Sequence, residues 1–260
     1  MTGTYEAIVI GAGQNGLTCA GYLATAGLKI LLLERYHAIG GMTLTEEVTG
    51  PGYWSDLHAS GYQLANLSPV PVDFALHEHG LELIEPGLPY AHAFPGGRMI
   101  AVSRDLDQTI ASIARISTAD AATCRRLFMR YQAAQDRIVG DMFAPPVSLA
   151  ARAAAFQTDP GGFDAYRISL QSVRSWCDEQ FESAEVTCLF ASFAAFVGAA
   201  PDDAGGAEMA WLFASVLQAA GNKYVKGGMN NVTRALASFL VAHGGEIRTS
   251  AGVERILRHG

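Results

Sequence analysis

The chain has 260 residues, enough to bury a substantial core without disulfides or a structural metal. Half of the residues are hydrophobic and 17% are charged, which excludes an intrinsically disordered protein. The 18 Lys and Arg against 25 Asp and Glu give a net charge of −7, which opposes binding to phosphate backbones. We therefore expect no nucleic-acid partner.

The cysteines give no sign of a disulfide framework or a metal site. They stand far apart, at Cys19, Cys124, Cys177 and Cys188, with no C-x-x-C spacing. We expect them to be small buried hydrophobes in a reducing compartment. The first apolar stretch has no Lys or Arg before it, unlike a secretory signal, so the sequence predicts a cytoplasmic location.

No apolar run reaches the ~20 residues that span a bilayer, so we expect no transmembrane segment. Peripheral membrane contact stays open, because one side of a predicted helix carries several arginines that could meet lipid headgroups or an anionic substrate. These arginines are Arg125, Arg126, Arg130 and Arg137.

The first 35 residues predict a β-α-β unit. The apolar run 7–10 is typical of a strand buried on both faces of a parallel sheet. Small and apolar residues at helical spacing over 13–26 indicate a helix that ends at Gly27. The run 28–33 is a second strand, joined to the first by a right-handed crossover.

The rest of the chain predicts a helical middle and a return to the first sheet. Glycines and prolines between residues 34 and 100 indicate loops and short strands. Predicted helices cover 106–116, a long segment from Ser117 onward, 171–182, 184–197, 206–220 and 230–243, and predicted strands cover 246–249 and 253–257. We expect three segments: 1–100 in a dinucleotide-binding domain, 101–222 in a mostly helical substrate domain, and 223–260 returning to the first domain.

The strongest motif lies between the first strand and the first helix. It is the G-x-G-x-x-G sequence Gly11-Ala12-Gly13-Gln14-Asn15-Gly16. Gly11 allows the tight turn, Gly13 lets a pyrophosphate approach the backbone, and Gly16 lets the helix pack closely. The phosphates would lie at the positive end of the helix. The motif predicts dinucleotide binding.

Two further features specify the dinucleotide. Glu34 ends the second strand 18 residues after Gly16, where its carboxylate can accept both hydroxyls of an adenosine ribose and would repel a 2′-phosphate. Gly40 and Gly41 form a second glycine pair of the kind that flavoproteins place across the phosphates. The sequence favours FAD, and an NAD-dependent dehydrogenase remains the alternative.

These motifs resemble a known family. The segments 8–17, Leu33-Glu34-Arg35 and Ile39-Gly40-Gly41 look like the phytoene desaturase-related FAD-dependent oxidoreductases, which include proteins named "pyridine nucleotide-disulfide oxidoreductase domain-containing protein 2". Segments 51–53, 79–86, 226–229 and 244–249 are also similar. The disulfide chemistry in that name is not carried over, because it needs a redox-active cysteine pair that this sequence lacks.

The resemblance implies an α/β fold in which a Rossmann-type, glutathione-reductase-like FAD-binding domain carries an inserted, largely helical substrate domain. The cofactor-binding residues that follow from the motif and the resemblance are Gly11, Gly13, Gln14, Asn15, Gly16, Glu34, Arg35, Gly40, Gly41, Met42, Thr43 and Val253. The implied activity is that of a dehydrogenase or desaturase acting on a small apolar organic substrate.

Family members are substantially longer, so we expect the C-terminal part of the family fold to be absent here. A homo-oligomer or a partner chain could complete the fold, and a non-catalytic dinucleotide-binding protein remains an alternative. Asp56 and His58, just after the second glycine pair, are the candidate catalytic residues, with Asp56 orienting His58 for acid/base work. No metal site is expected.

Overall fold

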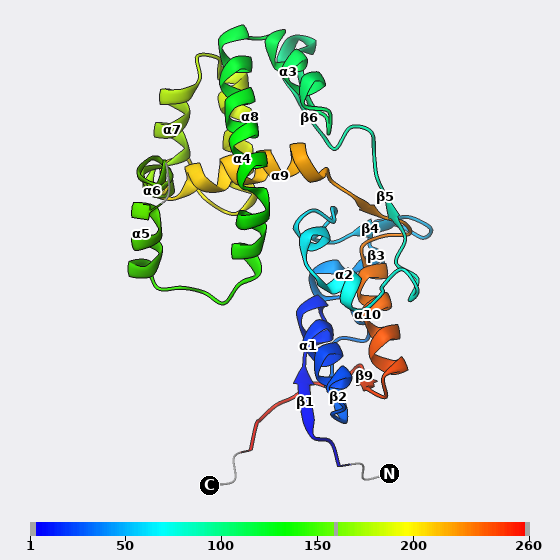
Figure 1. Ribbon diagram of the computed structural model, residues 1–260. Helices are drawn as coiled ribbons and strands as arrows, with labels where there is room; N and C mark the ends of the chain where they lie inside the picture. The colour runs from blue at the N-terminus through cyan, green and yellow to red at the C-terminus, as the bar shows by residue number, and fades with distance from the viewer. Residues whose placement is uncertain (1–3, 159–160, 258–260) are drawn as a thin grey trace. The chain divides into compact units, whose positions relative to one another are not determined.

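The computed structural model describes residues 4–158 and 161–257, and the chain divides into two compact units (Figure 1). Unit 1 is Met1–Glu85 with Lys223–Gly260, and unit 2 is Pro86–Asn222. The first boundary lies earlier than residue 100, because strands β6 (Tyr90–Ala93) and β7 (Met99–Val102) pair with each other, and β7 packs against helix α3 (Leu106–Ala114).

Unit 1 is built on the predicted β-α-β unit. Strands β1 (Ala7–Ile10), β2 (Ile30–Leu33) and β9 (Glu246–Arg248) form a parallel sheet in the order β1-β2-β9. Helix α1 (Gln14–Thr25) makes the crossover between the first two strands. The chain therefore returns to the first sheet through β9 after it has formed unit 2.

Helices α1 and α10 (Asn230–Ala242) lie side by side on one face of this sheet (Figure 1). Leu17 of α1 and Leu240 of α10 are fully buried together with Leu32 of the sheet. Full burial of one such side chain contributes about 2 kcal/mol. The two helices thus hold together segments that lie far apart in the sequence.

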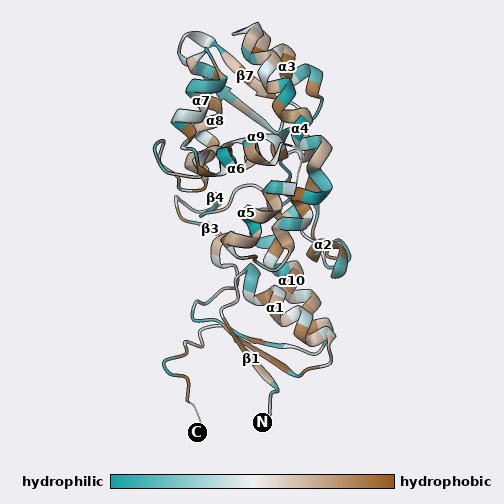
Figure 2. Ribbon diagram, turned by 60° about the vertical axis from the view of Figure 1, so that its left-hand side comes forward, coloured by the Kyte–Doolittle hydropathy of each residue, from teal (hydrophilic) through white to brown (hydrophobic). Residues whose placement is uncertain are grey.

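The opposite face of the sheet differs from the prediction. The side chains of Ile8 and Ile10 are 57% and 52% exposed, so the prediction that this strand is buried on both faces is wrong. Successive side chains of a strand point to opposite faces, and only the face that carries Val9 is covered by helices. β1 is also an edge strand, and in Figure 2 it has the brown colour of apolar residues.

The prediction of a strand over 253–257 is also wrong. The Ser250 N–H donates to the Tyr36 carbonyl at 2.8 Å, and the Ala251 N–H donates to the Glu34 carbonyl at 2.8 Å. Beyond these contacts the described chain offers no neighbouring strand with which the segment could pair, and β conformation needs such a partner. Val253 is 39% exposed.

Short elements complete unit 1. They are the 3₁₀ helices η1 (Gly41–Thr43) and η2 (Leu64–Leu67), the helix α2 (Val70–Asp73), the antiparallel pair β3 (Thr45–Glu47) and β4 (Trp54–Asp56), and the antiparallel pair β5 (Leu83–Ile84) and β8 (Tyr224–Val225).

Unit 2 is largely helical, as predicted. Besides α3 it contains the 3₁₀ turn η3 (Pro95–Gly97) and α4 (Thr118–Phe143), α5 (Leu149–Thr158), α6 (Gly162–Leu170), α7 (Val173–Gln180), α8 (Ala184–Phe196) and α9 (Gly206–Ala220). Side-chain caps start several helices at the expected places: Ser117 accepts from the Asp120 N–H at 3.0 Å, and Ser183 accepts from the Val186 N–H. Helix α6 was not predicted.

The arginines of α4 are engaged within the protein. Arg125 pairs with Asp107 at 2.7 Å, and Arg130 lies over the ring of Trp211. Across the described ranges 4–158 and 161–257, no helix is long and apolar enough to cross a membrane.

The cysteines are only partly as expected. Cys124 and Cys177 are buried, whereas Cys19 and Cys188 are exposed, and all four are free thiols. Cys19 lies on the side of α1 that faces away from the sheet, opposite the buried Leu17 and Ala20. The prediction of four buried cysteines is therefore wrong for two of them.

Candidate cofactor site

The turn from β1 into α1 has the geometry that its glycines predict. Gly11 has a φ of 100°, a backbone conformation that favours glycine, and its N–H donates to the Leu33 carbonyl at 2.7 Å. A Cβ at Gly16 would lie 2.0 Å from the Gly11 carbonyl oxygen. The helix can therefore approach the turn this closely only with glycine at that position.

The N-terminus of α1 is suited to an anion. Gly13 is the N-cap residue with an ordinary φ of −79°, and the first turn contains no acidic side chain. The amides of the first turn, including those of Gln14, Asn15 and Gly16, have no partner within the helix. They lie at the positive end of the helix dipole, where phosphates bind well.

A second glycine loop lies against the first. The Gly40 N–H donates to the Ala12 carbonyl at 3.0 Å, and Gly13 and Gly40 form a parallel β-bridge. Gly40 and Gly41 have φ values of 151° and 55°. A Cβ on Gly41 would lie 3.0 Å from the Gly13 Cα, so the two loops meet backbone to backbone in a cradle that side chains would fill.

The residues after the second pair close this loop. Thr43 is 5% exposed, and its hydroxyl donates to the Gly40 carbonyl at 2.8 Å. Met42 is 56% exposed. Both residues belong to the 3₁₀ turn η1, so one short element positions Gly41, Met42 and Thr43 together.

Glu34 is oriented from two sides. Its Oε2 accepts a hydrogen bond from the Ala12 N–H at 2.7 Å, and its Oε1 accepts one from the Tyr36 N–H at 2.8 Å. Each of these two carboxylate oxygens has a further lone pair, so Oε1 and Oε2 can both still accept hydrogen bonds from ribose hydroxyls. Arg35 follows, and Val253 lies two residues beyond the segment that bonds to Glu34.

The predicted acid/base pair is not formed. Asp56 Oδ1 accepts from the Thr45 hydroxyl at 2.6 Å and from the Met229 N–H at 2.9 Å. His58 is exposed, and among the hydrogen bonds of the described chain none joins it to Asp56. The structure therefore joins Asp56 to Thr45 and Met229 instead.

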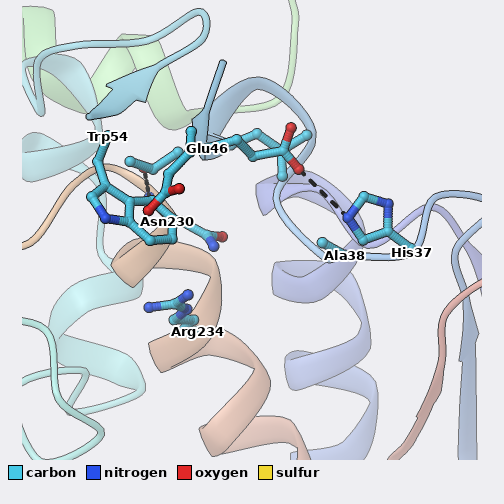
Figure 3. Close-up of a pocket in the computed structure, with 9 residues that line it drawn as sticks. His37, Ala38, Glu46, Trp54, Asn230 and Arg234 are labelled. Atoms are coloured by element: carbon cyan, nitrogen blue, oxygen red, sulfur yellow. Dashed lines mark hydrogen bonds and ion pairs between the residues drawn. The ribbon is translucent and has the colours of Figure 1, made fainter. Parts of the chain in front are cut away.

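A pocket that the sequence did not reveal includes Thr45, the partner of Asp56, in its lining (Figure 3). It is open, has a volume of about 460 Å³, and is lined by His37, Ala38, Leu44, Thr45, Glu46, Glu47, Trp54, Asn230 and Arg234. His37 Nε2 lies 3.8 Å from Glu46 Oε1. Sequence reasoning missed the pocket because its lining comes from three segments that only folding brings together.

The chemistry of the site fits a dinucleotide. The glycine backbone offers amides to the phosphates, and the Glu34 carboxylate offers acceptors to a ribose. Within residues 4–158 and 161–257 there is no group of three or more metal-ligating side chains. A family model described as "Flavin containing amine oxidoreductase" matches residues 16–260. The chain belongs to the flavin-containing amine oxidoreductase family.

The curated relatives of this flavoprotein agree with the predicted family. The chain is 28% identical to a limonene dehydrogenase subunit of Castellaniella defragrans over 257 residues, 97% of this chain and 46% of the relative. It is 28% identical to the pyridine nucleotide-disulfide oxidoreductase domain-containing protein 2 of Rattus norvegicus, covering 97% and 48%. With hydroxyneurosporene desaturase of Cereibacter sphaeroides it shares 29% identity, covering 98% and 51%. The chain thus spans about half the length of these relatives.

Solved structures confirm the fold class. An oxidoreductase from Methanosarcina mazei superposes with a TM-score of 0.62 at 18% identity, covering 97% of this chain and 53% of the other. The predicted α/β fold, a flavin-binding domain with an inserted helical unit, is confirmed for this member of the family.

Proposed function

We propose that this chain binds FAD and forms the cofactor-binding part of an oxidoreductase that acts on a small apolar organic substrate. The observation that carries the proposal is the contact between the two glycine loops at the N-terminus of α1, beside the doubly oriented carboxylate of Glu34. Family membership supports a flavin as the dinucleotide.

In this proposal different residues bind different parts of FAD. The first-turn amides from Gly13 to Gly16 and the loop from Gly40 to Thr43 hold the pyrophosphate, Glu34 accepts the ribose hydroxyls, and Arg35 and Val253 lie on the adenine side. When bound, a flavin supplies the capacity to accept a hydride. Of the two catalytic candidates, His58 keeps an exposed side chain, whereas Asp56 is engaged by Thr45 and Met229.

The relatives support an apolar substrate. The names of two of them refer to limonene and hydroxyneurosporene, which are largely hydrocarbon. In this proposal unit 2 is the substrate unit, and further polypeptide, either more of the same protein or a partner chain, covers the apolar sheet face at Ile8 and Ile10. A cytoplasmic location remains a prediction from the sequence.

The test is flavin binding by matched glycine variants. Gly13→Val should abolish retention of FAD, because its side chain would fill the space between the two glycine loops. Gly13 has an ordinary φ, and a Cβ there lies 3.7 Å from its nearest neighbour, the Gly41 Cα; circular dichroism checks that the variant folds. Gly50→Ala in the β3–β4 hairpin, where a Cβ is equally well tolerated, should retain FAD.

Absorption between 300 and 550 nm after removal of excess cofactor gives the readout. A folded wild-type chain that retains no FAD contradicts the proposal. Retention of NADH instead would favour the alternative nicotinamide enzyme, and a bound flavin that no reductant or acceptor changes would favour a non-catalytic role.

A further inference from the structure

Unit 1 contains one cluster of buried polar side chains. Apart from tyrosine, the buried polar side chains of its described residues are Thr43, Thr45, Asn230 and Thr233, which are between 0% and 7% exposed. All four lie where the second glycine loop meets the N-terminus of α10. Buried polar groups are costly unless they are paired, so a cluster confined to this place calls for a local explanation.

Hydrogen bonds join the cluster into a network around Asp56. Asp56 Oδ1 accepts from the Thr45 hydroxyl at 2.6 Å and from the Met229 N–H at 2.9 Å. The Thr45 hydroxyl oxygen in turn accepts from the Asn230 N–H at 3.0 Å. Two amides at the start of α10 are therefore satisfied by side chains of the β3–β4 hairpin, which lies far earlier in the chain.

A second branch reaches the glycine loop itself. The Thr43 and Thr233 hydroxyl oxygens lie 3.3 Å apart, and either hydroxyl can donate to the other. Each hydroxyl has one proton, so when one donates across this gap the other keeps its bond to a backbone carbonyl, Gly40 at 2.8 Å for Thr43 or Asn230 at 3.1 Å for Thr233. The loop thus meets α10 through this threonine pair, and the Ala12 carbonyl through the Gly40 N–H.

The approach of α10 to the hairpin depends on close backbone packing. Gly228 has a φ of 99°, and a Cβ there would lie 2.7 Å from the Thr45 side chain. The segment that returns from unit 2 therefore reaches Thr45 and Asp56 only because it presents glycine.

We propose that Asp56 is a positioning residue that locks the Gly40–Thr43 loop to the N-terminus of α10, and so sets the geometry of the phosphate cradle. The proposal rests on FAD binding as the proposed function. It replaces the role of orienting His58, and it explains why the buried polar groups of unit 1 gather here.

The central variants are Asp56→Ala, which leaves the Thr45 hydroxyl and the Met229 N–H without their acceptor, and Asp56→Asn, whose amide oxygen can still accept both bonds. Asp56→Ala should raise the FAD dissociation constant by about tenfold or more, while Asp56→Asn stays within about threefold of wild type. The matched control is Asp73→Ala, which removes another carboxylate that accepts from a hydroxyl at 2.6 Å, that of Tyr22, at a place without contact to the glycine loops.

Amide hydrogen exchange without cofactor provides the second readout. Asp56→Ala should speed exchange at the amides of 229–230 and also at those of 40–45, and Asp73→Ala should leave both segments unchanged. If amide exchange over 40–45 in Asp56→Ala stays at the wild-type rate, Asp56 is not a positioning residue. The same conclusion follows if Asp73→Ala weakens FAD binding as much as Asp56→Ala does. If Asp56→Ala does not fold, Thr45→Val tests the same lock, with Thr45→Ser as the variant expected to restore it.

The two hypotheses fail in different ways. A wild-type chain that binds no FAD overturns the proposed function, whereas the exchange measurement, made without cofactor, still decides whether Asp56 fixes the loop.

Discussion

Glu34 Oε2 accepts a hydrogen bond from the backbone N–H of Ala12 at 2.7 Å, which ties the end of β2 to the middle of the first glycine turn. The same carboxylate accepts from the Tyr36 N–H through its other oxygen. The residue proposed to bind the ribose therefore also shapes the turn that binds the phosphates.

This double role predicts the behaviour of Glu34 variants. Glu34→Ala leaves two amides without their acceptor and should lower the free energy of unfolding by about 1–3 kcal/mol as well as weaken FAD binding. Glu34→Gln keeps one acceptor oxygen, so its losses should be smaller. Urea unfolding and FAD titration measure the two effects, and a Glu34→Ala chain with wild-type values of both would contradict this role.

Gly16 tests the close contact of α1 with the turn. Gly16→Ala places a Cβ 2.0 Å from the Gly11 carbonyl oxygen, and the strain should cost about 1–3 kcal/mol or more of stability. Gly140→Ala, also in a helix but with nothing within 4 Å of the new Cβ, should stabilise by about 0.5–1 kcal/mol. In thermal unfolding, Gly16→Ala should lower the midpoint temperature and Gly140→Ala should raise it. Equal shifts of the two midpoints would contradict a close contact at Gly16.

The thiols should differ in reactivity. Burial raises the pKa of Cys177 to about 12, and burial with the nearby Asp120 raises the pKa of Cys124. Iodoacetamide at pH 8 should therefore label Cys19 and Cys188 in the folded chain and all four thiols in denaturant, as mass spectrometry can measure. Rapid labelling of Cys177 in the native protein would show that this part of unit 2 opens readily.

Tyr62 predicts a loss of stability in alkali. Burial raises its pKa to about 12, above the value near 10 of an unfolded tyrosine, so the folded chain holds the phenolic proton more tightly. Its contribution is complete below pH 10 and declines as the pH rises toward 12, by about 1 kcal/mol between pH 10 and 11. Urea unfolding measured between pH 9 and 12 tests this: in Tyr62→Phe the free energy of unfolding should fall less with pH than in the wild type. If it falls equally in both proteins, Tyr62 is not the cause of the decline.

The exposed sheet face should tolerate polar substitution in this chain. Ile10→Thr, at a side chain that is 52% exposed, should change the free energy of unfolding by less than about 0.5 kcal/mol, whereas Leu32→Thr on the helix-covered face should cost several times more. Loss of association with a covering polypeptide in Ile10→Thr, measured by sedimentation, would support the proposed cover. Equal destabilisation by both variants would show that the face is already protected.

The β-α-β unit, the glycine turn and Glu34 could be predicted from the amino-acid sequence, because each depends on local chemistry. Four apolar residues before Gly11, helical spacing after Gly13 and a strand ending in Glu34 specify hydrogen-bonding and steric requirements within 35 residues. The helices of unit 2 that were predicted depend on the same kind of signal, since serine caps and periodic apolar residues act within one or two turns.

Which faces are covered and which polar groups meet depends on long-range packing, and these features could not be predicted. The exposure of Ile8 and the unpaired segment after Ala251 depend on neighbours that local pattern does not encode. In the sequence, an aspartate two residues before a histidine looks the same whether it is catalytic or structural. The hydrogen-bond partner Met229 lies 173 residues from Asp56. A hydrogen bond over that distance exists only after α10 has packed beside α1, so the free energy of long-range packing, and not local propensity, assigns the role of Asp56.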